Sequence, residues 1–349
     1  RDKKEVVVAI DADTGKENWS HPMTSTDYGH DGGNAGARNN KGGDGPRSTP
    51  TIDEGRVFVM SAHLVLYALN EKTGHLIWKK DLIKEHAGRN IKWKNAASPV
   101  VAGNHVYVVV GGKGQSIMAI DKISGRVVWK SGDELMTHST PTLATINGVR
   151  QVIFFANKGL VSYNAKTGQE LWCYPFKFAT STAISPIAAG DIVYCSAGYS
   201  VGSAAVKILK TGAGMKAEEL WRIHGHKNIA NHWSTPVYQD GHLYGMFSFK
   251  KWGSGPLTCV ELATGKIKWS EEGFDPGNCI IADDHILALT DDGQVVLAEV
   301  NTQRYQEVAR GKVLQGKCWS TPVLSNGRIF IRSTTEAACL DVSGKRASR

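Results

Sequence analysis

Cationic, amide and indole side chains recur just before segments of the Ser-Thr-Pro or Ala-Ser-Pro type in this sequence. The residues concerned are Arg47, Lys94, Asn95, His138, Asn231, His232, Trp233, Lys317 and Trp319. Cations and amides hydrogen-bond to anions, and indole rings offer flat faces for stacking. If the fold brings these positions together, they form a site for a planar or anionic ligand.

Carboxylate and thiol chemistry is sparse at the same positions. Asp44 and Asp275 are the nearest carboxylates, and both lie in Gly-rich segments. The six cysteines include no adjacent pair and no Cys-x-x-Cys, so we expect no metal centre and assign no catalytic residue. Cys279 and Cys318 begin equivalent segments and could form a disulfide if their Cα atoms lie close enough. Cys259 and Cys339 stand where other copies of a repeat have Ala or Ser, which predicts small buried side chains.

That repeat supplies the elements that position the candidate residues. One pattern recurs at 9–19, 68–78, 119–129, 162–172 and 259–269, and weaker copies lie at 206–221 and 298–308. In the clear copies a strand ends in Asp or Asn, or in Glu at 261, and a Gly that tolerates positive φ follows in a hairpin turn. Every copy except 298–308 has one indole that is expected to pack between neighbouring sheets: Trp19, Trp78, Trp129, Trp172, Trp221 and Trp269.

Together with the Pro-containing segment, each repeat spans about 40 to 50 residues and four strands, the size of a propeller blade. Innermost strands are predicted to start near Arg47, Ala96, Ser139, Thr182, Trp233, Asn278 and Trp319. The third-strand pattern also occurs at 6–11 and 337–342, which predicts an all-β, eight-bladed propeller whose first and last blades are incomplete in this chain. The alternative is a seven-bladed propeller in which residues 16–19 complete the last blade and residues 6–11 have no partner.

We expect one propeller domain over residues 1–349, with a flexible Gly- and Asn-rich insertion loop at 23–44 and a basic tail at 345–349. The insertion is either a lid or a disordered loop, and its His30 and Asp31 are weak candidates for a metal or substrate contact. A second irregular segment, 249–256, contains Trp252. The net charge of +8 is scattered and not gathered into a stripe, so we do not expect nucleic-acid binding.

The Ala-x-Asp-x-x-Thr-Gly-x-x-x-Trp pattern of 9–19 and its copies resembles the pyrroloquinoline-quinone (PQQ) repeat over essentially the whole chain. Proteins with this repeat include quinoprotein alcohol dehydrogenases and BamB-like outer-membrane assembly proteins. The resemblance implies an extracytoplasmic location, periplasmic or secreted, with membrane association through a segment before residue 1. In the methanol-dehydrogenase branch it also implies PQQ with Ca²⁺, an Asp base and a vicinal disulfide.

Three functions are compatible with this sequence. The first is a binding or scaffold propeller that holds a protein partner, or a small anionic or planar ligand, in its central funnel or on its rim. The second is a PQQ-dependent quinoprotein dehydrogenase that oxidises an alcohol or a polymer. The third is a carbohydrate-binding propeller that stacks sugars on Trp233, Trp252 and Trp319. The lack of adjacent cysteines and the scarcity of carboxylates at the strand starts favour the first.

Overall fold

A computed structural model of the chain describes residues 1–28, 46–178, 180–212, 214–225, 229–247 and 255–344. The fold is a β-propeller of four-stranded antiparallel blades, so the predicted all-β propeller class is confirmed. The number of blades is seven, as in the alternative, and not the eight of the main prediction. Within every sheet the strands are neighbours in chain order, which is the meander expected from successive hairpins.

The chain divides into two compact units, each described by itself. The first comprises residues 1–195 and 206–219, and the second comprises residues 196–205 and 220–349. The single domain that the sequence suggested therefore stays a prediction.

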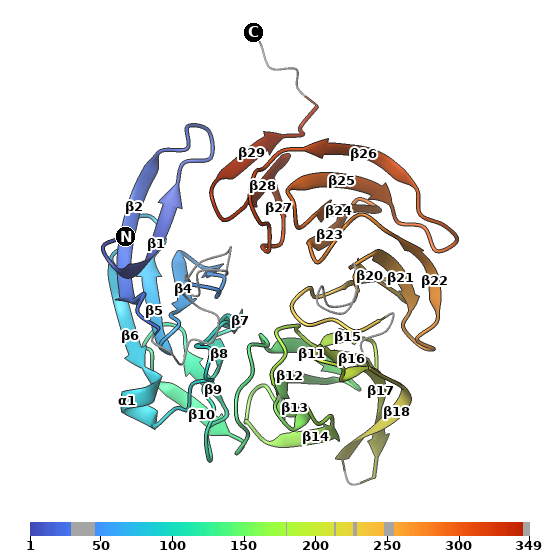
Figure 1. Cartoon of the computed structure of the whole chain (residues 1–349). Helices are drawn as coiled ribbons and strands as arrows, with labels where there is room; N and C mark the ends of the chain where they lie inside the picture. Colours follow the sequence, from blue (N-terminus) through green and yellow to red (C-terminus); the bar gives the residue numbers. More distant parts are fainter. Residues whose placement is uncertain (29–45, 179, 213, 226–228, 248–254, 345–349) are drawn as a thin grey trace. The chain divides into compact units, whose positions relative to one another are not determined.

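The first unit contains the sheets at the blue and green end of Figure 1. Its two-stranded sheet is β1 (Lys4–Ile10) and β2 (Glu17–Ser25). The next sheet is β3 (Thr51–Asp53), β4 (Arg56–Met60), β5 (Val65–Asn70) and β6 (Leu76–Asp81), followed by helix α1 (Leu82–His86). Then come β7 (Val100–Ala102), β8 (His105–Val109), β9 (Ile117–Asp121) and β10 (Val127–Ser131). The fourth sheet is β11 (Thr142–Ile146), β12 (Val149–Ala156), β13 (Gly159–Asn164) and β14 (Glu170–Pro175).

The boundary between the units runs through a sheet made of β15 (Ile187–Ala189), β16 (Ile192–Ala197), β17 (Gly202–Thr211) and β18 (Gly214–His224). The second unit continues with β19 (Val237–Gln239), β20 (His242–Met246), β21 (Leu257–Glu261) and β22 (Ile267–Glu271). A further sheet is β23 (Asn278–Ala282), β24 (His285–Leu289), β25 (Gln294–Glu299) and β26 (Glu307–Lys312). The last is three-stranded, with β27 (Val323–Ser325), β28 (Arg328–Arg332) and β29 (Ala337–Asp341).

Seven of these sheets have three or four strands, which is the blade number of the seven-bladed alternative, and β1–β2 is a further, two-stranded sheet. The alternative left residues 6–11 without a partner strand. In the structure β1 pairs with β2, and Ala9 lies opposite Trp19. The same Ala–Trp register recurs at Ala68 and Trp78, so the first repeat forms the same hairpin as the complete blades.

The recurring turn of the repeat is held by its polar residue. The Oδ1 atom of Asn70 accepts hydrogen bonds from the backbone N–H groups of Lys72 and Thr73, each at 3.0 Å. Asp121 does the same for Ile123 and Ser124, at 3.2 and 2.7 Å. Because the side chain satisfies these donors, the turn needs no water or partner to close.

The repeated indoles link one hairpin to the next within each unit. Trp19, Trp78 and Trp129 donate through Nε1 to the carbonyls of Glu71, Lys122 and Ala165, at 2.9, 3.3 and 3.1 Å. In the second unit Trp221 and Trp269 donate to Leu262 and Asn301, at 2.8 and 2.6 Å. Trp172 differs, because its Nε1 bonds to Gln151 of its own sheet at 2.6 Å.

In the turns at Gly74, Gly125, Gly168 and Gly265 the glycine makes room for the indole of the preceding repeat. A Cβ atom on Gly168, whose φ is +73°, would lie 2.6 Å from the Trp129 ring, and one on Gly74 would lie 2.4 Å from the Trp19 ring. The Gly is therefore required twice, for its positive φ and for the close approach of the ring.

The Ser-Thr-Pro segments tie neighbouring inner segments together. Thr49 N–H donates to Ser98 Oγ at 2.8 Å, and Ser98 N–H donates to Thr140 Oγ1 at 2.9 Å. One residue after the proline, Thr51 and Thr142 donate through Oγ1 to the carbonyls of Pro99 and Pro186, at 2.7 and 2.6 Å. The motif thus connects consecutive blades of the first unit through hydroxyl groups.

Most innermost strands begin later than predicted. The sequence placed starts near Arg47, Ala96 and Ser139, whereas β3, β7 and β11 begin at Thr51, Val100 and Thr142. The reason is that proline has no N–H to donate to a ladder, so pairing starts only after it. The strand near Asn278 begins where it was predicted to begin.

Two further expectations need correction. Strand β2 continues to Ser25, so the first residues of the predicted 23–44 insertion belong to a sheet. Cys339 is exposed, because β29 has no fourth strand beside it in the described part of the chain, whereas Cys259 is buried as predicted. His30, Asp31, Asp44, Trp252 and the tail 345–349 lie outside the described residues.

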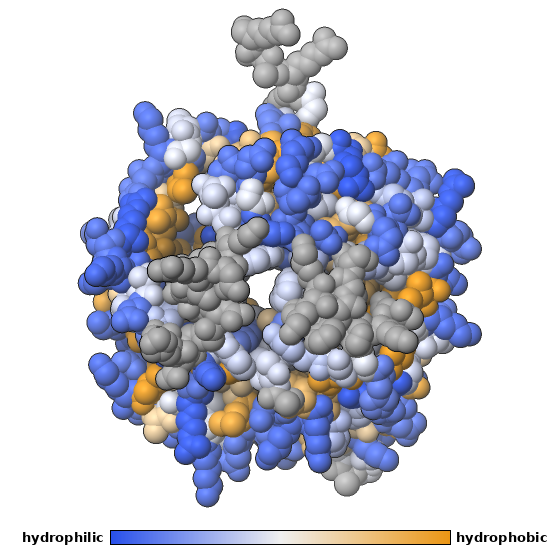
Figure 2. Space-filling view, viewed as in Figure 1, coloured by the Kyte–Doolittle hydropathy of each residue, from blue (hydrophilic) through white to orange (hydrophobic). Residues whose placement is uncertain are grey.

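Within the ranges that the structure describes, no helix is long and apolar enough to cross a bilayer. The exposed surface in Figure 2 is mainly hydrophilic, with apolar residues in small separate groups. The apolar side chains lie mainly between the sheets, for example Phe58, Val108, Ile120 and Phe154 in the first unit.

Candidate functional site

The end of a sheet at which its first strand begins carries two kinds of loop. One is the segment that leads into the first strand, and the other is the turn between the second and third strands, because antiparallel strands reverse direction at each turn. Arg47, Lys94, Asn95 and His138 lie in such segments of the first unit, whereas Asn231, His232, Trp233, Lys317 and Trp319 lie in the second. The candidate residues therefore form two groups, one in each unit.

In the first unit, Arg47 and Lys94 meet at one loop. Arg47 is exposed, and its Nη1 donates to the carbonyl oxygen of Trp93 at 2.7 Å. That carbonyl belongs to the peptide bond preceding Lys94, whose φ of +63° is unusual for a residue with a side chain. We name residues 89–95, together with Arg47, the Arg47 loop cluster.

His138 lies against this cluster. Its ring centroid is 6.2 Å from that of Trp93, and its Nδ1 is 2.9 Å from Ser181 Oγ. Burial lowers the pKa of His138 to about 4, and the positive charge of Arg47 acts in the same direction, while the Lys94 carbonyl opposes both. His138 is therefore neutral at pH 7 and adds no charge to the cluster.

Asn95 and Asn231, two of the predicted ligand-binding residues, hold backbone segments of their loops. Both are fully buried, and their side chains bond to backbone groups. The Asn95 amide donates to the carbonyl of Ala97 at 2.9 Å and accepts from its N–H at 3.0 Å, while Asn231 Nδ2 donates to Met246 at 3.0 Å. They pin the loops and are not available to a ligand.

Aromatic rings dominate one candidate group in the second unit. His232 packs edge-on against Tyr199 with a centroid distance of 4.8 Å, and against Trp233 at 5.6 Å. Trp233 Nε1 donates to the Pro276 carbonyl at 3.4 Å. Tyr199 lies in the β16–β17 turn, where both it and Ser200 have positive φ. This strained turn places a partly exposed phenol beside His232.

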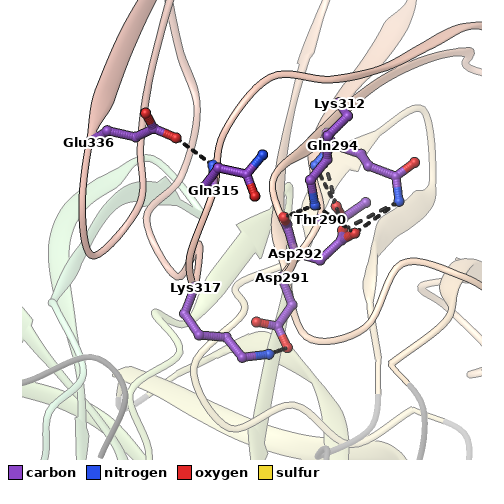
Figure 3. A network of polar contacts seen from close by, with 8 residues as sticks. All are labelled: Thr290, Asp291, Asp292, Gln294, Lys312, Gln315, Lys317 and Glu336. Carbon is purple, nitrogen blue, oxygen red and sulfur yellow. Dashed lines mark hydrogen bonds and ion pairs between the residues drawn. The ribbon is translucent and has the colours of Figure 1, made fainter.

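Lys317 differs from Arg47 because its charge is neutralised. Its Nζ lies 2.7 Å from Oδ2 of Asp291, a carboxylate that is only 1% exposed (Figure 3). Asp291 also fixes the loop that carries Lys317, since its carbonyl accepts from Cys318 N–H at 2.9 Å. Lys317 therefore acts as the counter-ion of a buried acid.

The polar network around this pair is extensive (Figure 3). Asp292 accepts from Gln294 Nε2 at 3.2 Å and forms an ion pair with Lys312 at 3.0 Å. Burial alone would raise the pKa of Asp292, but hydrogen bonds from Thr290, Lys312 and Gln294 hold it at about 2. Glu336 accepts from the backbone N–H of Gln315 at 2.5 Å. These contacts order the turn between β24 and β25 and the segment after β26.

Trp319, next to this network, remains accessible. Its side chain is 45% exposed, and its carbonyl accepts from Asn278 Nδ2 at 2.8 Å. Cys279 and Cys318 are buried free thiols and form no disulfide. Burial raises the pKa of the Cys279 thiol to about 12, which keeps it protonated and unreactive.

Sequence reasoning missed three residues of these groups: Trp93, Tyr199 and Asp291. Tyr199 and Asp291 lie in turns between second and third strands, and only first-strand starts were compared. The antiparallel rule could have found them, because those turns share an end of the sheet with the first-strand starts. No spacing in the sequence indicates that the Trp93 ring reaches His138.

Comparison with known proteins relates this geometry to a family. A profile of the family described as "Outer membrane protein assembly factor BamB" matches residues 3–271. The chain belongs to this family. It is 27% identical over 240 residues to a BamB from Shewanella oneidensis, a match covering 65% of this chain and 57% of that protein. Identity to a BamB from Moranella endobia is 24%, over 84% of this chain and 74% of that protein.

Solved structures share the fold. BamB from Moraxella catarrhalis aligns over 97% of this chain and 88% of its own, with a TM-score of 0.64 and 15% identity. A quinohemoprotein alcohol dehydrogenase from Comamonas testosteroni aligns over 93% of this chain and 67% of its own, with a TM-score of 0.61 and 14% identity. At these identities the likeness concerns the fold and leaves the chemistry open.

The described candidate residues do not fit a PQQ–Ca²⁺ pair. Ca²⁺ requires several oxygen ligands, with carboxylates prominent among them. The positions at the strand starts carry Arg, Lys, His and Trp side chains, and Asp291, a buried carboxylate beside the second group, is already bound to Lys317. Glu5, the other buried carboxylate among the described residues, accepts hydrogen bonds from Tyr28 and from the Ala62 N–H. The amide oxygen of Asn95 accepts a backbone hydrogen bond. Binding Ca²⁺ there would require breaking the Asp291–Lys317 pair.

Proposed function

We propose that this protein is an extracytoplasmic scaffold that binds a protein partner through the loops at the first-strand end of its blades, and that it takes part in outer-membrane protein assembly. The observation that carries the proposal is the family match over residues 3–271. The names of the BamB relatives support the same role, as an assembly factor at the outer membrane. The match spans 57% of the Shewanella protein, so we assign the role of that protein to this chain only as part of the proposal.

The candidate loops favour protein binding over catalysis. Their ionisable groups are an exposed Arg47, a neutral His138 and a Lys317 engaged with Asp291. None of these is arranged as a general base with an accessible carboxylate, as an alcohol oxidase would need. Rigid loops with exposed Arg and Trp side chains are typical of the energetic centres of protein interfaces.

Site-specific photo-crosslinking tests the proposal. The photoreactive residue p-benzoylphenylalanine replaces Trp319 or Trp93, and in a control variant it replaces Lys166 in the β13–β14 turn. Each variant is illuminated in envelope preparations of the source organism. We expect one crosslinked outer-membrane assembly protein from the two loop positions and none from Lys166.

Two other measurements test the competing functions. PQQ with Ca²⁺ is added to the purified chain, and dye-coupled oxidation of alcohols is followed together with the thermal midpoint. Oxidation of an alcohol in the presence of PQQ would overturn the scaffold proposal. So would a glycan that raises the thermal midpoint of the wild type but not of a Trp233 variant. Crosslinking that is equal at Trp319 and Lys166 would also overturn it, since the loops would then have no special role.

A further inference from the structure

We propose that the Arg47 loop cluster binds the carboxylate side chains of an acidic, extended segment of a partner protein. This inference rests on the proposed scaffold function and names the chemistry of the partner segment. The cluster lies entirely within the first unit and within the described residues.

Among the residues that the structure describes, neither Arg47 nor Lys94 has an acidic partner. A guanidinium carries five N–H donors, and the one hydrogen bond of Arg47 in the described part of the chain goes to the Trp93 carbonyl at 2.7 Å. Lys92 and Lys94 form no ion pair with any residue that the structure describes, and Lys92 is exposed. With Arg89, which is also exposed, the cluster carries four positive charges, and none of them has an ion-pair partner among the residues that the structure describes.

Other lysines near the sheets contrast with this cluster. Lys122 is buried between Asp53 at 2.6 Å and Glu54 at 3.0 Å, and Lys317 is bound to Asp291 at 2.7 Å. Those cations stabilise contacts inside the fold. No described residue pairs with Arg47 or Lys94 in this way, so we assign their charges to an external anion.

The loop is held in place before any ligand arrives. Asn90 Nδ2 and Asn95 N–H both donate to the Ala62 carbonyl, at 2.8 and 3.0 Å, and Lys94 N–H donates to Ile91 at 2.9 Å. Ile91 packs against the main core of the first unit. A loop fixed in this way loses little conformational entropy on binding, and the positive φ of Lys94 is the strain that the fixed geometry imposes.

The arrangement of donors favours an extended segment with several carboxylates. The donors come from two separate inner segments, one leading to β3 and the other to β7, so a single small anion reaches only some of the donors. The Trp93 ring, partly buried against His138, adds an apolar surface beside the charges. Arginine binds carboxylates with two parallel hydrogen bonds, which makes Arg47 the principal contact.

The test uses a fluorescent peptide of alternating Glu and Ser residues, with the same peptide in which Gln replaces Glu as the control ligand. Fluorescence anisotropy measures binding to the wild type, R47Q, K94Q and the matched control K166Q, which removes an exposed positive charge from the β13–β14 turn. We expect R47Q to weaken binding of the Glu peptide about tenfold, K94Q to weaken it about threefold, and K166Q to leave it unchanged. The Gln peptide should bind none of the four proteins.

Folding of each variant is checked by its thermal midpoint, which we expect to change little because Arg47 is exposed and makes one hydrogen bond. The inference is overturned if the Gln peptide binds as well as the Glu peptide, or if K166Q loses as much affinity as R47Q. It is also overturned if PQQ binds in an Arg47-dependent way while the Glu peptide does not. If crosslinking from Trp319 still captures an assembly protein, only the acidic-segment inference fails and the scaffold function stands.

Discussion

His138 gives the sharpest prediction for the first unit, because burial and a neighbouring charge act on it together. Its pKa falls from an ordinary value of 6.5 to about 4 in the folded protein, with burial as the main cause and Arg47 as the second. Replacing His138 by Asn keeps a group that can bond to Ser181 and removes the titration. The wild type and H138N should therefore respond differently to acid.

The sign follows from proton linkage. A histidine whose pKa is lowered by folding binds a proton more readily when unfolded, so its contribution to stability is complete above pH 6.5 and is lost as the pH falls toward 4. Between pH 7.5 and pH 5 the wild type should lose about 2 kcal/mol more unfolding free energy than H138N, since each pKa unit corresponds to about 1.4 kcal/mol.

Urea unfolding of both proteins at the two pH values measures this difference, and carboxylates that titrate in both proteins cancel. NMR titration of the His138 ring in the folded state gives its pKa directly, and R47Q should raise that pKa because it removes the second cause of the shift. A ring that titrates near 6.5, or equal acid sensitivity of the wild type and H138N, would refute the assignment of His138 as a buried neutral group.

Two other predictions concern the sheets and the network of Figure 3. G168A should lower the unfolding free energy by about 1–3 kcal/mol, because the new Cβ would lie 2.6 Å from the Trp129 ring at a φ of +73°. The control G148A has open space around it and a φ of +79°, so it should cost only the backbone strain of about 1 kcal/mol. Equal losses in urea unfolding would contradict the role of the indole. K317M should destabilise the second unit by about 3 kcal/mol, because Asp291 would be left buried without its counter-ion. The double variant K317M/D291N should recover most of that loss. A double variant as unstable as K317M would show that the pair itself is not the cause.

The repeat made the architecture predictable. Tight turns of the Asn70 or Asp121 type need a polar residue followed by Gly, and the period between turns gives the blade size, so local chemistry alone identifies the sheets. Strand limits were less accurate, because the proline of each inner segment delays pairing to residues such as Thr51 and Val100. The hydroxyl links between consecutive Ser-Thr-Pro segments were not foreseen, since they depend on how one blade stands against the next.

The sequence located the polar and aromatic residues at the strand starts but not the neighbours that set their charge. Sequence alignment of the strand starts found Arg47, His138 and Lys317 but treated their charges as equivalent. Charge state depends on neighbours that are distant in sequence, as Asp291 is from Lys317 and as Arg47 is from His138. Spacing within one chain cannot show which cation has a buried carboxylate at 2.7 Å and which has none.

This difference between the two cations separates Lys317, which stabilises the fold, from Arg47, to which we assign a role in binding. Lys317 offsets the cost of burying Asp291, and the pair holds the loop before β27 in place, so replacing it should reduce stability first. Arg47 is exposed and makes one hydrogen bond to a carbonyl, so replacing it should leave stability nearly intact and reduce binding. If R47Q and K317M both lowered stability by the same amount, the distinction between a structural and a recognition cation would be lost, and with it the reason for placing the partner's carboxylates at the Arg47 loop cluster.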